Sequence, residues 1–340
     1  MTARTRHRLD PDTRPPAVLH RDEEQARLHA ATTEPLQHLY VHGPQGAGKT
    51  LLAHTALAQC RTTAHYLSCV SHNTQYKVLK TLCERISDEN LNSGYHTAQL
   101  QDRLAHHLQH TPTVIVLDDL AFLLANDGND LLYFLSRLKH RADLGIVGIS
   151  ASPTPLADHL DERTYSSLQP RQLICSPYAE DETVHILTQR AETALPPGTV
   201  EPAALEYIAA TTTNLTLALH WLTYAATEAT RITVDVLRSV QADAMQRYRD
   251  GLLGEFTWHH SVLLDVIDRM TADTDSVTTG PVYNRYIDYC RESGTDPLTA
   301  RRIGDYLTHL ELLHLIDVTH HRGGAQGKTR EIRPTSLQEF

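Results

Sequence analysis

The first half of the chain alternates short apolar runs with segments of helical periodicity. Short strands are predicted at residues 35–43 and 64–69. Residues 113–120 and 144–150 are short β-branched apolar runs of the kind buried in a parallel sheet. Amphipathic helices are predicted at residues 49–60, 74–86 and 97–109, and Thr97 has the residue type of an N-cap for the last of them. Strands that alternate with helices predict an α/β fold in which a parallel sheet is covered on both faces.

The pattern changes after residue 178, where strand-like runs stop. Helical periodicity fills residues 179–195, 201–212, 215–229 and 233–245. A joint at residues 248–257 precedes three further helices and a terminal hairpin. Residues 1–16 are polar, basic and proline-bearing, so a loose arm is expected there. We therefore expect four parts, namely the arm (1–16), an α/β base (17–176), a helical domain (177–250) and a C-terminal domain (251–340).

The composition limits the classes of function that this protein can have. The formal net charge of −10 means that any nucleic-acid contact must be local, because the surface as a whole is not basic. No apolar run approaches the ~20 residues of a membrane span, and the N-terminus lacks the apolar core of a signal peptide. We therefore expect a cytoplasmic protein without a membrane partner. The five cysteines form no CxxC pair and are expected to be reduced thiols.

The stretch HGPQGAGKT at residues 42–50 fits the pattern G-x-x-x-x-G-K-[ST] between a predicted strand and a predicted helix. Its glycines let backbone N–H groups turn inward around phosphates, which predicts an ATP or ADP site. Lys49 would reach the β- and γ-phosphates, and the Thr50 hydroxyl would bind Mg²⁺. The expected nucleotide contacts are Gly43, Pro44, Gln45, Gly46, Ala47, Gly48, Lys49, Thr50 and Leu51.

The second half of a nucleotide site requires a strand that ends in an acid. The stretch VIVLDD at residues 114–119 provides one, and Asp118 is placed to hold Mg²⁺ directly or through water. Asp119 lies where a general base for an attacking water is expected. A helix N-cap or a solvated loop acid is the alternative interpretation of Asp119.

These features, in this order, resemble the archaeal origin-recognition initiators of the Orc/Cdc-six type, which are AAA+ ATPases. The resemblance spans residues 8 to 334 and includes the N-terminal PPAVLHRDEEQ, the two nucleotide motifs, the strand GIVGIS, the Pro-Tyr turn in QLICSPYAEDE and the C-terminal helices with their hairpin. It implies an AAA+ P-loop base, a helical lid and a C-terminal winged helix. It also implies that Arg21 and Tyr178 lie near the bound nucleotide.

The resemblance further implies a role in replication. Such a protein would recognise double-stranded origin DNA in the nucleoid and help to load a replicative helicase of the MCM type. It would also make a second DNA contact from its AAA+ base, for which Lys77, Lys80 and Arg85 are candidates.

Three positions depart from the family pattern in ways that weaken hydrolysis. The second acid is Asp119 where the family has Glu, and the shorter side chain displaces the base from its water. Ala151 follows the strand where the family has a polar sensor, although Ser150 and Ser152 flank it. Thr216 stands where the lid normally supplies an Arg.

Arg163 is the candidate for a finger-like Arg, with a surface salt bridge as the alternative. Because the binding residues are intact, the sequence predicts a nucleotide that is held and hydrolysed very slowly or not at all.

The C-terminal domain is acidic overall, with nine Lys and Arg against thirteen Asp and Glu in residues 254–340. Its hairpin nevertheless gathers cations around three glycines, as expected of a wing that follows phosphates or a minor groove. The hairpin residues predicted to contact DNA are Arg322, Lys328 and Arg330.

The helix before the hairpin is expected to begin at a Thr299 N-cap. Arg301 and Arg302 fall in its first turn, and a recognition helix presents its first residues to base edges. Pairing of these arginines with Asp296, Asp305 or Glu311 on the same surface is the alternative.

Two other functions fit the same order of domains. One is a regulatory switch in which bound nucleotide holds a protein partner. The other is a DNA-binding repressor or plasmid maintenance factor, which the weakened hydrolytic residues favour.

Overall fold

The computed structural model describes residues 7–33, 35–92, 94–138, 142–152, 154–321 and 329–335. These residues form two compact units. The first runs as far as Leu195 and also contains Thr213–Thr216, and the second contains Pro196–Thr212 and the described residues from Leu217 onward. No helix among the described residues is long and apolar enough to cross a membrane.

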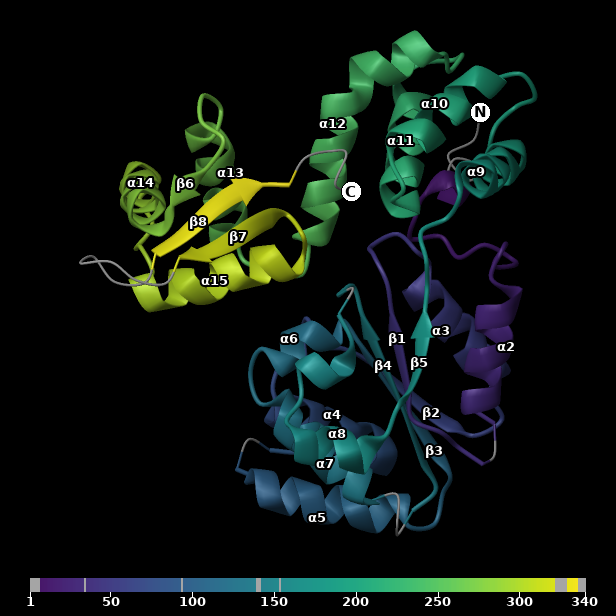
Figure 1. The fold of residues 1–340 in the computed structure, drawn as a ribbon, viewed down its shortest axis with the longest axis vertical. Coiled ribbons are helices and arrows are strands. Elements are labelled where there is room, and N and C mark those ends of the chain that lie inside the picture. The colour runs from purple at the N-terminus through teal and green to yellow at the C-terminus, as the bar shows by residue number, and fades with distance from the viewer. Residues whose placement is uncertain are drawn as a thin grey trace. The chain divides into compact units, whose positions relative to one another are not determined.

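The first unit is built on a five-stranded parallel sheet with strand order β2-β3-β4-β1-β5 (Figure 1). Its strands are β1 (Leu39–His42), β2 (Thr63–Ser68), β3 (Thr113–Asp118), β4 (Leu144–Ser150) and β5 (Arg171–Ile174). Every residue of β1, β3 and β4 is buried, as the apolar runs predicted. The predicted α/β fold is therefore confirmed, and the carboxyl ends of β1, β3 and β4 meet at one edge of the sheet.

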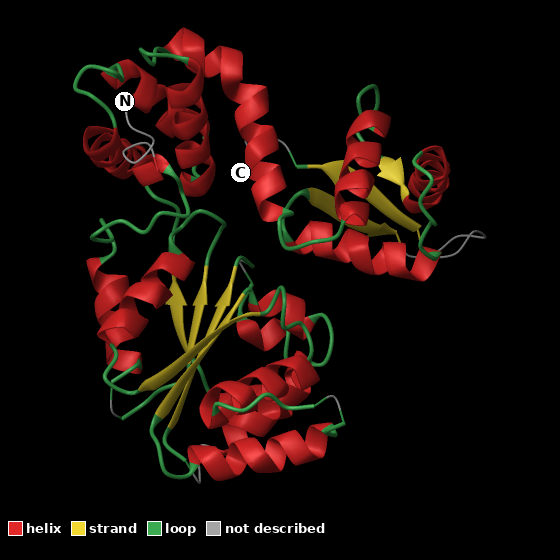
Figure 2. Cartoon of the chain, turned by 180° about the vertical axis from the view of Figure 1, so that it is seen from behind, coloured by secondary structure: helices red, strands yellow, loops and turns green. Residues whose placement is uncertain are grey.

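Helices cover both faces of this sheet. They are α2 (Asp22–Ala31), α3 (Lys49–Gln59), α4 (Gln75–Ser87), α5 (Thr97–Leu108), α6 (Leu120–Leu124), α7 (Gly128–Leu138) and α8 (Glu162–Leu168). The first unit also contains α9 (Glu180–Ala194), which follows the last strand, and the 3-10 turns η1 (His7–Leu9) and η2 (Leu156–Asp158). The helices α2 and α3 lie on one face, and α4 to α8 lie on the other (Figures 1 and 2).

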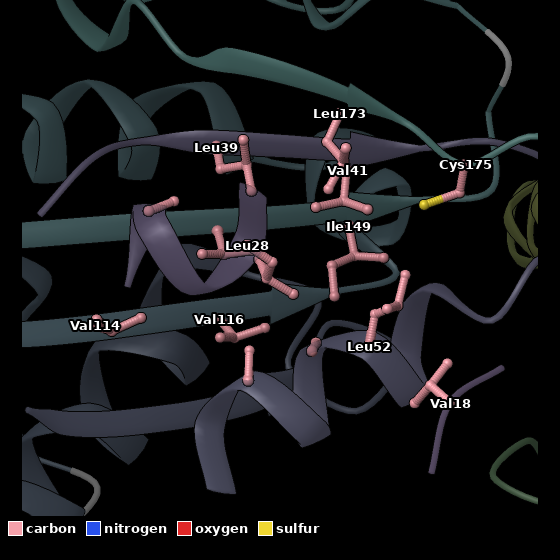
Figure 3. Packing of buried hydrophobic residues seen from close by; sticks show 14 of the residues in the cluster. Val18, Leu28, Leu39, Val41, Leu52, Val114, Val116, Ile149, Leu173 and Cys175 are labelled. Carbon is pink, nitrogen blue, oxygen red and sulfur yellow. The ribbon is translucent and has the colours of Figure 1, made fainter. Parts of the chain in front are cut away.

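The core beneath α2 and α3 holds the strands that lead to the nucleotide loop. Val41, Val116 and Ile149 project from the sheet and pack against Leu28 and Leu52 of the two helices (Figure 3). Each of these side chains is at most 1% exposed. Burial of one such side chain contributes about 1.5–3 kcal/mol, so the ends of β1, β3 and β4 are firmly positioned.

The described part of the N-terminal segment differs from the expected loose arm. Leu9 is 1% exposed, and the Arg190 guanidinium of α9 donates to the carbonyl oxygens of Arg8 and Thr13, both at 2.9 Å. Burial lowers the pKa of Arg190, and the acid Asp10 opposes this effect. The described part of this segment is polar in composition, but hydrogen bonds from Arg190, far along the chain, hold its backbone.

One predicted helix cap is wrong by one residue. Helix α5 begins at Thr97, and its N-cap is His96. The backbone N–H of His96 donates to Oε1 of Gln99 at 2.9 Å, so the glutamine at the third helical position closes the turn.

The second unit contains helices followed by a small antiparallel sheet with strand order β6-β8-β7. Its elements are α10 (Pro202–Thr211), α11 (Leu215–Glu228, whose first two residues belong to the first unit), α12 (Val234–Leu252), α13 (Trp258–Met270), β6 (Val277–Thr278), α14 (Thr279–Glu292), α15 (Ala300–Leu312), β7 (Ile316–His321) and β8 (Thr329–Pro334). Three helices with a terminal hairpin form a winged helix, as predicted. The joint is shorter than expected, because α12 continues to Leu252.

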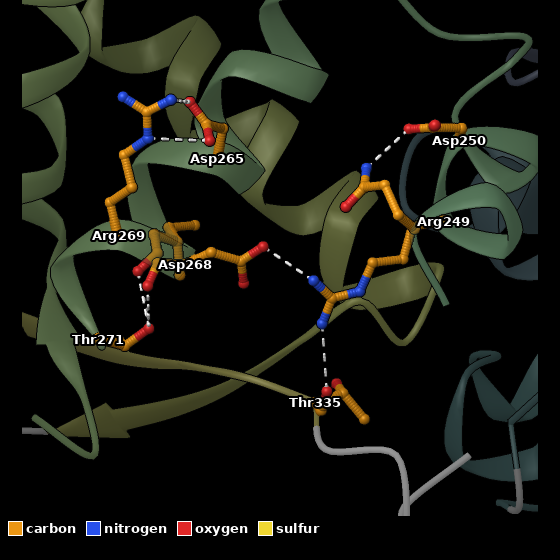
Figure 4. A network of polar contacts seen from close by, with 9 residues as sticks. Arg249, Asp250, Asp265, Asp268, Arg269, Thr271 and Thr335 are labelled. Carbon is orange, nitrogen blue, oxygen red and sulfur yellow. Dashed lines mark hydrogen bonds and ion pairs between the residues drawn. The ribbon is translucent and has the colours of Figure 1, made fainter. Parts of the chain in front are cut away.

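A charged contact connects α12 to the winged helix. The Arg249 guanidinium donates to Oδ2 of Asp268 in α13 at 2.8 Å and to the carbonyl of Thr335 at 3.5 Å (Figure 4). The Arg249 and Asp268 side chains are 13% and 34% exposed. Burial raises the pKa of Asp268, and Arg249 opposes that rise.

We expect Arg249→Ala to lower the free energy of unfolding by about 1–3 kcal/mol at pH 7, because it leaves a half-buried carboxylate without its donor. The folded-state pKa of Asp268 would then rise further, so protonation would favour the folded variant. The loss should therefore be smaller at pH 4.5 than at pH 7. Urea unfolding at the two pH values measures this difference.

The control is Arg291→Ala, which removes an arginine that is 72% exposed and pairs with Asp288 within α14. This variant should change the free energy of unfolding by no more than about 0.5 kcal/mol. Equal losses for the two variants would contradict a structural role for Arg249.

Candidate functional site

The phosphate loop, residues 43–48, joins the end of β1 to the start of α3 and has the backbone shape that its glycines predicted. The φ angles of Gly43, Gly46 and Gly48 are +148°, +73° and +84°, a region that favours glycine. A Cβ at Gly43 would lie 2.0 Å from the carbonyl oxygen of Cys175. The end of β5 therefore presses directly on the start of the loop.

Asn214 and Tyr178 fit against the rest of the loop. A Cβ at Gly46 would lie 2.2 Å from Oδ1 of Asn214, which precedes α11 and is 1% exposed. A Cβ at Gly48 would lie 2.8 Å from the hydroxyl of Tyr178. Two segments distant in sequence, residues 175–178 and the residue before α11, thus fit closely against the three glycines.

Lys49 is 8% exposed and its ammonium lies over the loop. Nζ donates to the carbonyl oxygens of Gly43 at 2.8 Å and Pro44 at 2.6 Å. Burial lowers the pKa of Lys49, while negative charge on Cys175, Asp119 and Asp118 would raise it. The ammonium is therefore positioned within the phosphate loop by backbone oxygens.

The other predicted loop contacts differ in accessibility. Pro44 and Thr50 are exposed, and Gln45 is half-buried. Ala47 is fully buried in the core, so only its backbone is available to a ligand, and Leu51 is half-buried and packs against that core.

Asp118 ends β3 and is 2% exposed. Its Oδ1 accepts the backbone N–H of Asp119 at 2.9 Å, and its Oδ2 accepts the hydroxyl of Tyr66 at 2.8 Å. Each carboxylate oxygen keeps a further lone pair. The carboxylate is thus held in one orientation and can still accept a hydrogen bond from metal-bound water, so the site fits a hydrated Mg²⁺.

Asp119 is exposed and has φ of +53° as the N-cap of α6. The left-handed backbone is unusual for a residue other than glycine. Its N-cap position matches the alternative interpretation, although its side chain makes no cap hydrogen bond.

Arg21 and Tyr178 lie together, as the resemblance implied for residues near the nucleotide. The Arg21 guanidinium lies 3.9 Å from the centre of the Tyr178 ring and donates to the carbonyl of Ser176 at 2.6 Å and to Glu24 at 3.3 Å. Arg21 and Tyr178 are only 5% and 4% exposed. Arg21 therefore packs on the tyrosine whose hydroxyl meets Gly48.

Arg163 lies in the first turn of α8. Its guanidinium is 4.0 Å from the centre of the Tyr133 ring and donates to the Tyr133 hydroxyl. The described contacts place Arg163 against α7 and not against the phosphate loop of its own chain. A finger-like role stays a prediction.

The first turn of α15 presents two exposed cations. Thr299 is its N-cap, as predicted, and accepts the backbone N–H of Arg302 at 3.5 Å. Arg301 and Arg302 are exposed, and among the described residues neither makes an ion pair. The alternative in which they pair with Asp296, Asp305 or Glu311 is therefore absent from the described part of the chain.

The hairpin cations are arranged differently. Arg330 donates to the carbonyl of Gly304 in α15 at 3.3 Å, and Arg333 pairs with Asp317 at 2.9 Å. Arg322 and Lys328 lie outside the described residues.

Two residues at the nucleotide site were not predicted. Tyr66, which orients Asp118, and Asn214, which packs on Gly46, have no sequence signal because their partners lie in distant segments. Their roles arise from the strand order and from the return of the chain before α11.

Comparison with known proteins agrees with this architecture. Residues 33–151 match the family described as AAA domain, and residues 253–338 match the family described as CDC6, C terminal winged helix domain. The chain is 26% identical to ORC1-type DNA replication protein 1 of Archaeoglobus fulgidus, over 96% of this chain and 86% of that protein.

Solved structures share the fold. The chain matches the Aeropyrum pernix ORC1 protein, solved in complex with DNA, with a TM-score of 0.75 and 25% identity over 98% of this chain and 94% of that one. Cdc6p from Pyrobaculum aerophilum matches with a TM-score of 0.60 and 20% identity over 97% and 94% of the two chains, which supports the fold alone.

The parallel sheet with its phosphate loop, the helical lid and the winged helix define an AAA+ ATPase with a C-terminal winged-helix domain. The chain belongs to the Orc1/Cdc6 family, whose members similar to it include ORC1-type DNA replication proteins.

We expect Gly46→Ala to weaken ADP binding at least ~10-fold, because the new Cβ overlaps Asn214 and the φ of +73° is strained for alanine. The control is Gly94→Ala, at an exposed position where a Cβ meets nothing within 4 Å. Titration calorimetry with ADP measures both. Unchanged affinity in Gly46→Ala would contradict the close packing of the loop.

Proposed function

We propose that this protein is an ATP-binding replication initiator that recognises origin DNA through its winged helix and helps to load a helicase of the MCM type. The observation that carries the proposal is the exposed pair Arg301 and Arg302 at the start of α15. The Aeropyrum pernix ORC1 protein, with which the chain shares its fold from end to end, was solved in complex with DNA, which supports the same class of ligand here.

The position of the two arginines is costly for the folded protein alone. A helix N-terminus carries a partial positive charge, so cations in the first turn are destabilising by a few tenths of a kcal/mol. A phosphate or a guanine edge would offset that repulsion. A DNA ligand therefore explains why these residues stand where neither caps nor ion pairs require them.

In this proposal the protein binds the nucleotide and hydrolyses it very slowly or not at all. Lys49 and the glycines provide the phosphate cradle, and Thr50 with Asp118 would hold Mg²⁺, which neutralises charge on the phosphates. Asp119 is shorter than the expected Glu and has a left-handed backbone. Thr216, near the start of α11, has no charge to place near a phosphate.

A repressor or plasmid maintenance factor is the second candidate. The weakened hydrolytic set favours it, because repression needs DNA binding and not turnover. A nucleotide-held switch for a protein partner would not account for the two exposed arginines.

We expect the purified protein with ATP to enrich a few discrete genomic fragments, and Arg301→Ala/Arg302→Ala to lose that enrichment. The double variant should also lower the slope of log affinity against log salt by about two units, because two phosphate contacts are lost at most. Fragment selection followed by salt-dependent binding to the selected site measures both.

The charge-matched control is Arg27→Ala/Arg231→Ala, which removes two exposed arginines from α2 and the segment before α12. This control should enrich the same fragments as the unaltered protein. Enriched sites at an origin favour the initiator, and sites at promoters favour the repressor. Equal enrichment by all three proteins would rule out a contact through α15.

We expect ATP turnover of the unaltered protein to stay within about threefold of Lys49→Ala, although only the unaltered protein binds ATP tightly. Release of phosphate under single-turnover conditions measures it. Turnover far above the Lys49→Ala value, and lost in Asp119→Ala, would show that Asp119 is a competent base.

A further inference from the structure

Helix α15 is preceded by a connection that has little packing of its own. Residues 295–299 join α14 to α15 and form neither helix nor strand. Asp296, Pro297 and Thr299 are exposed, and Leu298 is half-buried. A segment with so little apolar burial needs firm partners for its backbone groups if it is to keep one conformation. The side chains that bind this backbone therefore determine where α15 begins.

Two tyrosine hydroxyls of α14 bind both backbone groups of Leu298. The backbone N–H of Leu298 donates to the Tyr286 hydroxyl at 3.1 Å, and its carbonyl accepts the Tyr283 hydroxyl at 3.3 Å. The two rings are stacked with their planes 18° apart and their centres 6.4 Å apart. Leu298 directly precedes Thr299, the N-cap of α15. This pair of tyrosines, the tyrosine clamp, therefore holds the last residue before the helix cap.

The clamp is also held from the side of α13. Tyr286 is 0% exposed, and its hydroxyl hydrogen-bonds Nδ1 of His259 at 2.8 Å. Burial raises the pKa of Tyr286, so the hydroxyl keeps its proton at neutral pH. A protonated hydroxyl can accept the Leu298 N–H and take part in the bond to His259 at the same time. Tyr286 thus joins α13, α14 and the connection to α15 through one buried oxygen.

The clamp is continuous with the exposed arginines of the proposed DNA contact. Arg301 and Arg302 are the second and third residues of α15, and Thr299 accepts the backbone N–H of Arg302 at 3.5 Å. Attraction to phosphates is long-ranged and tolerates a displaced side chain, whereas hydrogen bonds to base edges need a fixed geometry. A displacement of this turn would therefore affect the reading of bases more than the attraction to the DNA backbone.

We propose that Tyr283 and Tyr286 are positioning residues that give α15 its specificity for DNA sequence. The inference rests on the proposed DNA binding through Arg301 and Arg302. The clamp holds the first turn of α15 in the orientation in which these two side chains meet base edges. Without the clamp the arginines still attract phosphates but lose most of their discrimination between sequences.

The test uses one site obtained from the fragment selection and a duplex of the same composition in scrambled order. The affinities of full-length Tyr283→Phe and Tyr286→Phe for both duplexes are measured at one salt concentration. We expect each variant to lower the ratio of the two affinities ~3–10-fold, the effect of one lost hydrogen bond. Affinity for the scrambled duplex should stay within about twofold, and the salt slope on the selected site should not change, because no cation is removed.

The matched control is Tyr289→Phe in the same helix. Tyr289 is half-buried, its ring lies near Trp258 and Arg269, and its hydroxyl has no partner among the described residues. This variant should keep the affinity ratio of the unaltered protein. An unchanged ratio in both clamp variants, or an equal loss of affinity for both duplexes, would overturn the positioning role while DNA binding stands. An unaltered protein that enriches no fragment would instead refute the proposed function on which the inference rests.

Hydrogen exchange tests the clamp without DNA and in the unaltered protein. The Leu298 amide should exchange slowly although its neighbours are exposed, because Tyr286 binds its N–H. Tyr286→Phe should speed this exchange ~10-fold, whereas Tyr283→Phe, which removes only the bond to the carbonyl, should change it less. Exchange of this amide in the unaltered protein at the rate of an unfolded chain would overturn the inference, even if a clamp variant failed to fold.

Discussion

The whole nucleotide site depends on the close approach of two distant segments to a loop whose backbone conformation favours glycine. Gly43 meets the carbonyl of Cys175, Gly46 meets Asn214, and Gly48 meets the hydroxyl of Tyr178. A Cβ atom at Gly43 or Gly46 would lie only 2.0 or 2.2 Å from the oxygen atom that it faces, which is too close for any side chain. Because these segments are residues 175–178 after β5 and the residue before α11, the shape of the loop is coupled to the turn after β5 and to the start of α11.

Residues that precede the sheet also stabilise the turn that contacts the loop. Arg21 donates to Ser176 and lies on the ring of Tyr178, so the segment before α2 stabilises the turn that contacts the loop. Further along, Arg190 binds the backbone of the N-terminal segment. A polar stretch with little apolar content is ordered in this way by charged donors to its carbonyl groups.

The winged helix shows how a protein of net charge −10 can present a local positive surface. Within its hairpin, Arg333 pairs with Asp317 and His321 pairs with Glu331, so an acid offsets the field of each of these side chains. The first turn of α15 has no such pairing among the described residues, so no acid offsets the field of Arg301 and Arg302 there. The local electrostatic potential of this surface therefore depends on where acidic side chains are absent and not on the total number of cations.

The sequence by itself determined the elements and the chemistry that depend on neighbouring residues. Strand and helix periodicity, the glycine pattern of the phosphate loop, the acid at the end of β3 and the Thr299 cap each lie within a short window, where local sterics and hydrogen bonding decide the outcome. Tertiary structure alone decided that Tyr66 orients Asp118, that Asn214 packs on Gly46 and that the described part of the N-terminal segment is held by Arg190. Those contacts join segments far apart in the chain, and they follow from the strand order and from side-chain packing, which no local pattern encodes.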